Sequence, residues 1–236
     1  MIVGKEEIHI KPLYLILMKN QLGNVKQCRT LIKHHYVFVN GNCVDDINYL
    51  VQTSDHITVH GQTMNSQPFL YLMMNKPKGY ICANSDQHYP CVVDLTPYDD
   101  CFCIGRLDVN TTGLLLLTND RSFLKKLLLP ENHIEKTYFV EVQYPLKKCL
   151  IQKFSEGVVI DENKVCLPAQ MEIIDDYHCY VTLYEGKYHQ VKKMFLSCEN
   201  KVIELKRITF AGIHLDETLK VGEFRNLNEN ELQLLQ

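Results

Sequence analysis

The sequence lacks any apolar run of the ~20 residues that a membrane-spanning helix needs. Its first seven residues, Met-Ile-Val-Gly-Lys-Glu-Glu, lack the charged and apolar regions of a secretory signal peptide. With 46% hydrophobic and 22% charged residues, the composition is that of a globular protein. We therefore expect a protein that stays in the cytoplasm and binds no membrane.

The ten cysteines include no Cys-x-x-Cys pair, the spacing typical of zinc sites. Several, such as Cys43 and Cys179, occupy apolar positions in strand-like segments, where thiols act as small hydrophobic groups. Cys101 and Cys103 lie close to the motif described below, but an i, i+2 pair is a poor metal signature. The sequence therefore predicts no metal and no chemistry for the cysteines.

An excess of positive charge is also missing, because the formal net charge is −3. Residues 1–64 carry six Lys or Arg against five Asp or Glu, and the remainder carries 19 against 23. Neither part is broadly basic, so any nucleic acid must be bound by a local patch.

The patterns of the first part of the chain predict helices at 13–18 and 25–32 and strands at 36–39, 43–44 and 56–59. Leu22-Gly23-Asn24 joins the two helices. Asn40-Gly41 lies between β-prone runs, which is the strongest short-range signal for a hairpin. Residues 62–68 are polar, with Gly61 before them and Pro68 at their end, and are typical of a linker. We expect a small domain at 1–64, a linker at 65–69 and a second domain at 70–236.

In the second domain, the patterns predict a strand from Tyr71 to Pro77, a buried run at 114–117, a helix from an Asp120 cap to Leu129, a strand at 135–142, a helix at 147–154, strands at 169–174 and 180–184, a helix at 189–196 and a strand at 202–210. No regular βαβ rhythm and no internal repeat occurs. The expected fold class is α+β, with a large, mainly antiparallel sheet.

Residues 105–115, Gly-Arg-Leu-Asp-Val-Asn-Thr-Thr-Gly-Leu-Leu, are the most informative segment. Arg106 and Asp108 precede a polar turn closed by Gly113, and a run of leucines follows. Charged residues beside a buried strand are costly unless they are paired or used. The pattern predicts a carboxylate held rigidly at the mouth of a sheet.

Two other interpretations of Asp108 compete with this one. Asp-Val-Asn-Thr-Thr-Gly could begin an EF-hand calcium loop, but the ninth position is Leu116 and the twelfth is Asn119, where a bidentate Glu is needed. The calcium interpretation fails on these ligands. Asp108 could instead only cap a turn, and the segment alone leaves that alternative open.

Four further segments carry polar side chains in a meaningful order. Pro77 ends a strand and Gly79 permits a sharp turn, so Lys76 and Lys78 are expected on that turn, where they can bind phosphates or simply be solvated. Lys136-Thr137-Tyr138 places an aromatic ring on a strand. Residues 185–195 join a strand to a helix through Gly186, and 204–208 form a charged strand.

In order and content residues 105–115 and these four further segments resemble the motifs of pseudouridine synthases, and residues 1–64 resemble the S4 RNA-binding domain. The resemblance spans nearly all of the chain. Gly-Lys-Tyr-His-Gln-Val-Lys-Lys-Met-Phe at 186–195 is most similar to the branch that modifies 16S ribosomal RNA. It implies an isomerase that converts a specific uridine to pseudouridine with no metal or cofactor. The implied partner is ribosomal RNA or a small-subunit assembly intermediate, bound by a monomer.

The resemblance also implies roles for single residues. Asp108 matches the catalytic carboxylate, acting as a covalent nucleophile or through a glycal intermediate. Lys192 matches the basic residue that pairs with it. Tyr138 matches the tyrosine that stacks on the flipped uracil and can relay a proton, and Arg106 matches the arginine that fills the gap left by the base. We expect Leu183 to pack as a wall under the aromatic ring.

The other residues expected to bind RNA are Arg29, Lys33, Lys76, Lys78, Gln190, Lys193 and Lys206. The alternatives are an S4-like domain that only packs, and a solvated helix face for Lys192 and Lys193. His189 has no partner at a useful spacing, so we expect it to make a structural hydrogen bond.

Two other functions compete with the 16S assignment. One is a 23S ribosomal RNA synthase, although relatives of that kind with an S4 domain usually carry Asn-Arg-Gln in place of Tyr-His-Gln. The other is a catalytically silent RNA-binding or assembly factor. Such a protein need not keep Arg106, Asp108, Tyr138 and Lys192 together, so the intact set argues against it.

Overall fold

The computed structural model describes residues 10–52, 54–66, 69–161 and 163–235. It divides into two compact units, one that ends at Leu70 and one that begins at Tyr71. No helix among the described residues is both long enough and apolar enough to cross a membrane.

The first unit contains helices α1 (Leu13–Lys19) and α2 (Val25–Lys33), a sheet in the order β3 (Asn42–Val44), β2 (Val37–Val39), β5 (Ile57–Val59) and β6 (Gln62–Met64), and the pair β1 (Ile10–Pro12) and β4 (Leu50–Gln52). Asn24 caps α2 and shares a capping box with Gln27. Asn40-Gly41 forms the predicted hairpin turn, with φ of 51° and 81°. The polar stretch at 62–68 is not all linker, because residues 62–64 form β6 and pair with β5. The predicted linker at 65–69 begins after that strand.

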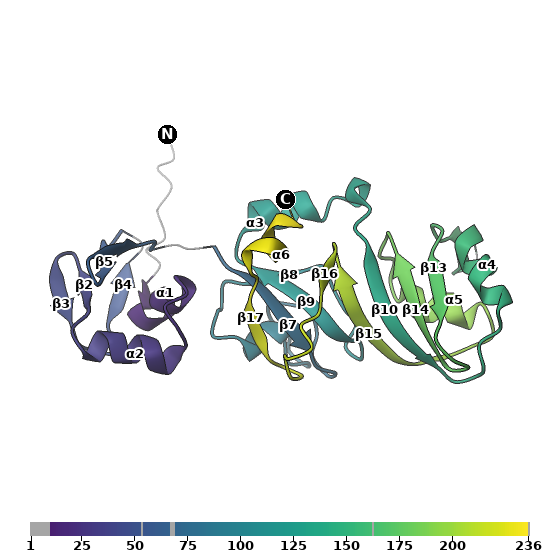
Figure 1. The fold of residues 1–236 in the computed structure, drawn as a ribbon, viewed down its shortest axis with the longest axis horizontal. Coiled ribbons are helices and arrows are strands. Elements are labelled where there is room, and N and C mark those ends of the chain that lie inside the picture. Colours follow the sequence, from purple (N-terminus) through teal and green to yellow (C-terminus); the bar gives the residue numbers. More distant parts are fainter. Residues whose placement is uncertain (1–9, 53, 67–68, 162, 236) are drawn as a thin grey trace. The chain divides into compact units, whose positions relative to one another are not determined.

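The second unit is built on one sheet in the order β13 (Gln170–Ile173), β14 (His178–Leu183), β10 (Lys136–Val142), β15 (Val202–Phe210), β9 (Thr112–Thr118), β7 (Tyr71–Lys76) and β17 (Phe224–Asn226), with β16 (Ile213–His214) on β15 and β8 (Phe102–Ile104) on β9. Every pairing is antiparallel except that of β15 with β9. The predicted α+β class with a large, mainly antiparallel sheet is confirmed (Figure 1).

Short helices and strand pairs complete the second unit: α3 (Arg121–Leu127), α4 (Cys149–Glu156), α5 (Gln190–Leu196), α6 (Glu229–Gln233), the 3₁₀ turns Val92–Leu95 and Pro130–Asn132, and the pair β11 (Val159–Ile160) and β12 (Lys164–Val165). Figure 1 shows α3 and α6 at the β7–β9 end of the sheet and α4 and α5 at the β13–β14 end. Phe154 of α4 meets Phe195 of α5 with ring centroids 5.1 Å apart.

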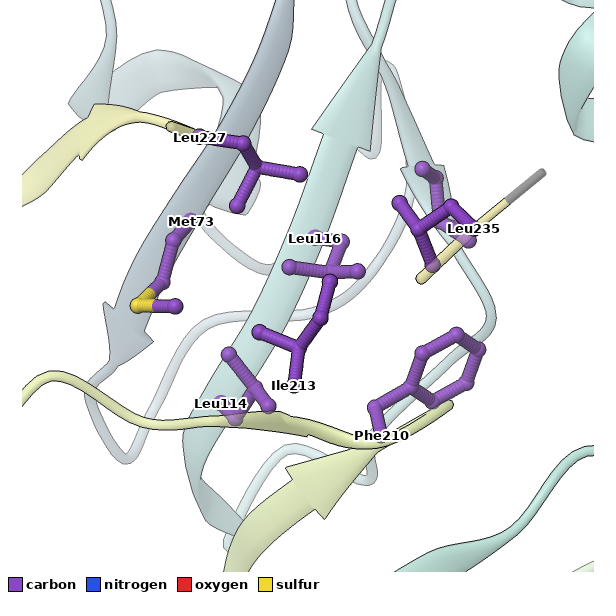
Figure 2. Close-up of a cluster of buried hydrophobic side chains, with 8 residues drawn as sticks. Met73, Leu114, Leu116, Phe210, Ile213, Leu227 and Leu235 are labelled. Carbon is purple, nitrogen blue, oxygen red and sulfur yellow. The ribbon is translucent and has the colours of Figure 1, made fainter. Parts of the chain in front are cut away.

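The leucine run of β9 lies at the centre of this unit, and Leu114, Leu115, Leu116 and Leu117 are all fully buried. Figure 2 shows the core around it, formed by Met73, Ile104, Leu114, Leu116, Phe210, Ile213, Leu227 and Leu235. Full burial of each leucine stabilises the fold by about 1.5–3 kcal/mol. The loop that precedes β9, which contains Asp108, is therefore attached to a rigid strand.

Candidate active site

The carboxylate of Asp108 faces two basic side chains from the beginning of α5. Lys192 Nζ lies 2.6 Å from Oδ2, and His189 Nε2 lies 3.6 Å from Oδ1. The first contact is a short, charge-assisted hydrogen bond, whereas the second is too long to be a hydrogen bond. About 25% of the Asp108 side chain is exposed. One carboxylate oxygen is thus held by a lysine 84 residues away, and the other is open.

The loop is closed by the main chain of Asp108, because the Thr111 amide donates a 3.0 Å hydrogen bond to its carbonyl oxygen. Within the described part of the chain, the Asp108 carboxylate interacts with Lys192 and His189. The alternative in which the side chain only caps a turn therefore loses its support.

Lys76 contradicts the prediction that it is displayed for phosphates, because its side chain is fully buried. It is the last residue of β7, in register with Gly113, and its Nζ points under the loop. There it lies 2.9 Å from the Thr111 carbonyl oxygen, 3.2 Å from that of Asp108 and 3.4 Å from that of Val109. Burial lowers the pKa of the Lys76 amine. The carbonyl oxygens replace water around the ammonium, so Lys76 fixes the loop from below.

We expect Lys76→Met to lower the free energy of unfolding of the second unit by about 1–3 kcal/mol, because it leaves buried carbonyl oxygens without a donor. The Asp108 carboxylate should lose its fixed position as well, since the loop loses its support. Urea unfolding followed by circular dichroism measures the first effect. Lys78→Met is the matched control, because Lys78 is 48% exposed and forms a surface ion pair with Glu204. Equal losses in both variants would contradict the role of Lys76.

Two thiols lie close to the same loop. The Leu107 amide donates a 3.3 Å hydrogen bond to Cys82 Sγ. A hydrogen bond with Cys103, the Leu107 amide and the nearby cations Lys76 and Arg207 lower the pKa of the Cys82 thiol to about 6, although burial opposes them. Cys82 and Cys103 together therefore support the loop. The sequence did not predict this role for Cys103. Among the described residues, no cluster of three metal-ligating side chains occurs.

Tyr138 lies on β10 with 9% of its surface exposed, in register with Val181 on β14 and Arg207 on β15. Leu183 is two residues from Val181 and therefore projects from the same face of β14. It is 3% exposed and pairs with Lys136, two residues before Tyr138, so that Leu183 and Tyr138 lie on the same face of the sheet. That Leu183 packs as a wall under the ring stays a prediction.

Arg207 was not predicted as a residue of the site. It is 1% exposed, its Nε donates a 2.7 Å hydrogen bond to the Leu114 carbonyl oxygen, and its guanidinium lies 4.9 Å from the centre of the Phe210 ring. A Cβ on Gly105 would lie 3.9 Å from an Arg207 terminal nitrogen, so this cation reaches the start of the Asp108 segment. The pattern of a charged strand could not show which of its cations is buried.

Gln190 contradicts the prediction that it contacts RNA, because it is 4% exposed and used within its own loop. Its Oε1 accepts from the Lys187 amide at 2.8 Å, and its Nε2 donates to Glu185 Oε1 at 2.7 Å. These bonds hold His189 at a φ of 54°. His189 also differs from the prediction, since its neighbour is the Asp108 carboxylate.

Three other basic residues that were predicted to bind RNA lie in different surroundings: Lys193, Lys206 and Arg106. Lys193 Nζ lies 2.5 Å from Asp161 Oδ2, not beside Asp108. Lys206 is exposed and projects from the face of β15 opposite to Arg207, so the structure does not bring it to Tyr138. Arg106 is exposed in the Asp108 loop itself, where it can meet a ligand.

In the first unit, Arg29 and Lys33 both lie on α2, as predicted. The Arg29 guanidinium stacks 4.6 Å from the centre of the Tyr14 ring, and its Nε is buried without a partner. Lys33 is exposed in the last turn of the helix. Lys33 is therefore the more accessible of the two for a phosphate.

Comparison with known proteins agrees with this geometry. A family model described as RNA pseudouridylate synthase matches residues 70–197, and an S4 domain model matches residues 19–57. An uncharacterized RNA pseudouridine synthase of Bacillus subtilis, YtzG, is 37% identical over 229 residues, which cover 93% of this chain and 96% of the relative.

Two further relatives carry the name ribosomal small subunit pseudouridine synthase A. That of Haemophilus influenzae is 36% identical over 89% of this chain and 92% of its own, and that of Vibrio cholerae is 41% identical over 75% of each. A crystal structure of a pseudouridylate synthase superposes with a TM-score of 0.69 at 34% identity, over 95% of this chain and 99% of that one. The chain thus belongs to the RNA pseudouridine synthase family and carries an S4 domain in front of its catalytic domain.

Proposed function

We propose that this protein isomerises a specific uridine of 16S ribosomal RNA, a 516-type site, to pseudouridine, with Asp108 as the nucleophile. The observation that carries the proposal is the Asp108–Lys192 pair, in which Lys192 holds Oδ2 and leaves Oδ1 open. The relatives named for the small ribosomal subunit support the choice of RNA.

The reaction breaks the C1′–N1 bond of uridine, rotates the freed uracil and rejoins it to the sugar through C5. Asp108 Oδ1 attacks the nucleotide, while Lys192 stabilises the charge of the carboxylate through Oδ2. Tyr138 stacks on the flipped uracil above the wall formed by Leu183, and Arg106 fills the gap in the RNA. These residues bind and orient the base. The rearrangement is redox-neutral, so the proposed reaction needs no cofactor.

The S4 domain captures the structured RNA, either ribosomal RNA or a small-subunit assembly intermediate, in the cytoplasm and as a monomer. Because the formal net charge is −3, bulk electrostatic attraction cannot supply the affinity. Placed cations supply it instead, with Lys33 and Arg29 on the first unit and Lys78, Lys193 and Lys206 on the second.

We expect deletion of residues 1–64 to weaken the binding of structured 16S RNA more than it changes the chemical step at saturating protein in a single turnover. Filter binding at several salt concentrations and rapid-quench kinetics measure the two effects. In the full chain, Lys33→Gln should lower the magnitude of the salt slope by about 0.9 if Lys33 contacts one phosphate. A truncated protein that folds and binds the RNA as tightly as the full chain would leave the S4 domain without a function.

The proposal is tested directly by incubating the purified protein with 16S and 23S transcripts and mapping pseudouridine in each. We expect one modified uridine in the 16S transcript. Modification of the 23S transcript alone would show that the substrate is 23S ribosomal RNA instead. Tight binding to RNA without modification, including RNA in a small-subunit precursor, would identify a silent assembly factor.

A further inference from the structure

Tyr188 presents an open aromatic ring beside the Asp108 carboxylate. It is 74% exposed, more than any other large hydrophobic or aromatic residue that the structure describes. Its ring stacks on that of His189 with centroids 3.9 Å apart and planes 19° apart, and His189 Nε2 lies 3.6 Å from Asp108 Oδ1. A single exposed aromatic elsewhere on the surface would need no explanation. This ring lies one stacked layer from the oxygen that Lys192 leaves open, so it borders the place of the reacting nucleotide.

The backbone around Tyr188 is held in place although the ring is exposed. His189, the next residue, has a φ of 54° and a ψ of 30°, a left-handed conformation that few non-glycine residues adopt. On the other side, the Lys187 amide donates a 2.8 Å hydrogen bond to Gln190, which donates in turn to Glu185 at 2.7 Å. A ring that is ordered before binding loses little conformational entropy when a ligand stacks on it.

The Tyr188 ring also has a cation beside it. Lys193 Nζ lies 5.1 Å from the ring centre, within the distance at which an ammonium is attracted to an aromatic ring. The same Nζ pairs with Asp161 at 2.5 Å, and 24% of the Lys193 side chain stays exposed. Aromatic rings with basic side chains beside them bind single-stranded nucleic acid, because the base stacks on the ring and the cation attracts the backbone.

Extrusion of the target uridine leaves its two neighbours in the RNA without a stacking partner on one side. Each neighbour is one phosphodiester link from the target ribose, which has to lie against Asp108. Its base therefore has to fit against the surface around that carboxylate. Unstacked bases of RNA are commonly bound by stacking on aromatic side chains. In the proposed reaction Arg106 fills the gap in the RNA, which gives no partner to a neighbouring base that turns out of its helix.

We propose that Tyr188 stacks on the base of a nucleotide next to the target uridine. The base takes the part of the ring surface that His189 and Lys193 leave open. Stacking tolerates every base, so this contact selects a target whose neighbour is free to leave its helix, not a particular neighbouring sequence. The inference rests on the proposed function and deepens it, because it names a residue that recognises the RNA around the target.

The test uses the full-length protein and transcripts into which one altered nucleotide is ligated beside the uridine that pseudouridine mapping identifies. The 5′ neighbour is abasic in one transcript, and the 3′ neighbour is abasic in another. Tyr188→Ala removes the ring, Tyr188→Leu keeps apolar bulk without a flat ring, and Tyr188→Phe keeps the ring. The matched control is Tyr144→Ala, because Tyr144 is a 53% exposed tyrosine two residues beyond the end of β10. Thermal unfolding shows whether each variant retains its structure.

We expect Tyr188→Ala to raise the dissociation constant for the ordinary transcript by about 5–150-fold, the range for the loss of one base stacked on an aromatic side chain. Tyr188→Leu should lose affinity in the same direction, whereas Tyr188→Phe and Tyr144→Ala should bind as the wild-type protein does. One of the two abasic transcripts should bind the wild-type protein more weakly. That loss should shrink in Tyr188→Ala by the factor that the substitution itself costs, because both changes remove the same contact.

Unchanged affinity in folded Tyr188→Ala and Tyr188→Leu would overturn the proposal, and so would an equal loss in Tyr188→Phe. Losses that simply multiply for both abasic transcripts would overturn it as well, since the ring and the base would then act independently. A slower single-turnover rate with unchanged affinity would show that the ring only positions His189 and Asp108. A wild-type protein that forms no pseudouridine in 16S or 23S transcripts would instead refute the proposed function.

Discussion

Asp108→Asn is expected to abolish pseudouridine formation while folding and RNA affinity are largely retained. The amide has nearly the size of the carboxylate, and it can still accept a hydrogen bond from Lys192, which lies 2.6 Å from Oδ2 in the wild-type protein. It is too weak a nucleophile to attack the nucleotide. Single-turnover assays with the purified variant and a 16S transcript measure the effect.

The control for Asp108→Asn is Asp161→Asn, which changes an exposed aspartate paired with Lys193 on the same helix as Lys192. That variant should keep its activity. Formation of pseudouridine by Asp108→Asn at more than trace rates would remove Asp108 from the mechanism.

Lys192→Met should give the second largest loss of pseudouridine formation. It leaves the Asp108 carboxylate without its lysine in a site where only 25–31% of the two side chains is exposed. Removing one partner of a buried pair costs about 3–5 kcal/mol, and partial exposure places this pair near the lower end. Where ~3 kcal/mol of this interaction is lost from the transition state, the chemical step is roughly 100-fold slower.

Lys193→Met is the matched variant, because it removes the adjacent lysine of the same helix. Lys193 faces Asp161 and the Tyr188 ring, so its loss should weaken RNA binding with little effect on the single-turnover rate. Mild and equal effects from both substitutions would show that the pair is only a solvated helix face.

The parts of the fold that could be predicted are those with a strong local signal. Asn40-Gly41 correctly predicted the first hairpin. Asp120 caps α3, as predicted, by accepting hydrogen bonds from the Ser122 and Phe123 amides. The buried leucines identified β9. The strands β8 and β17 were missed because each has only three residues and forms through pairing with β9 and β7, which no local pattern encodes.

The residues of the candidate site could likewise be predicted only in part. The resemblance to a family predicted the Asp108–Lys192 pair, which the structure forms. Lys76 was misplaced because a lysine before a proline normally ends in solvent, whereas here β7 carries it to the last paired position beneath the loop. His189 was assigned a structural bond because its partner lies far away in the sequence. Such contacts depend on tertiary packing and have no signature in local spacing.

We propose that this protein, through Asp108, makes one pseudouridine in 16S ribosomal RNA. The most direct measurement maps pseudouridine in 16S and 23S RNA from cells that lack the protein and express either the wild-type chain or Asp108→Asn. We expect that one 16S site is lost without the protein, returns with the wild-type chain and stays absent with Asp108→Asn. An unchanged 16S map in the cells without the protein, or restoration of the site by Asp108→Asn, would contradict it.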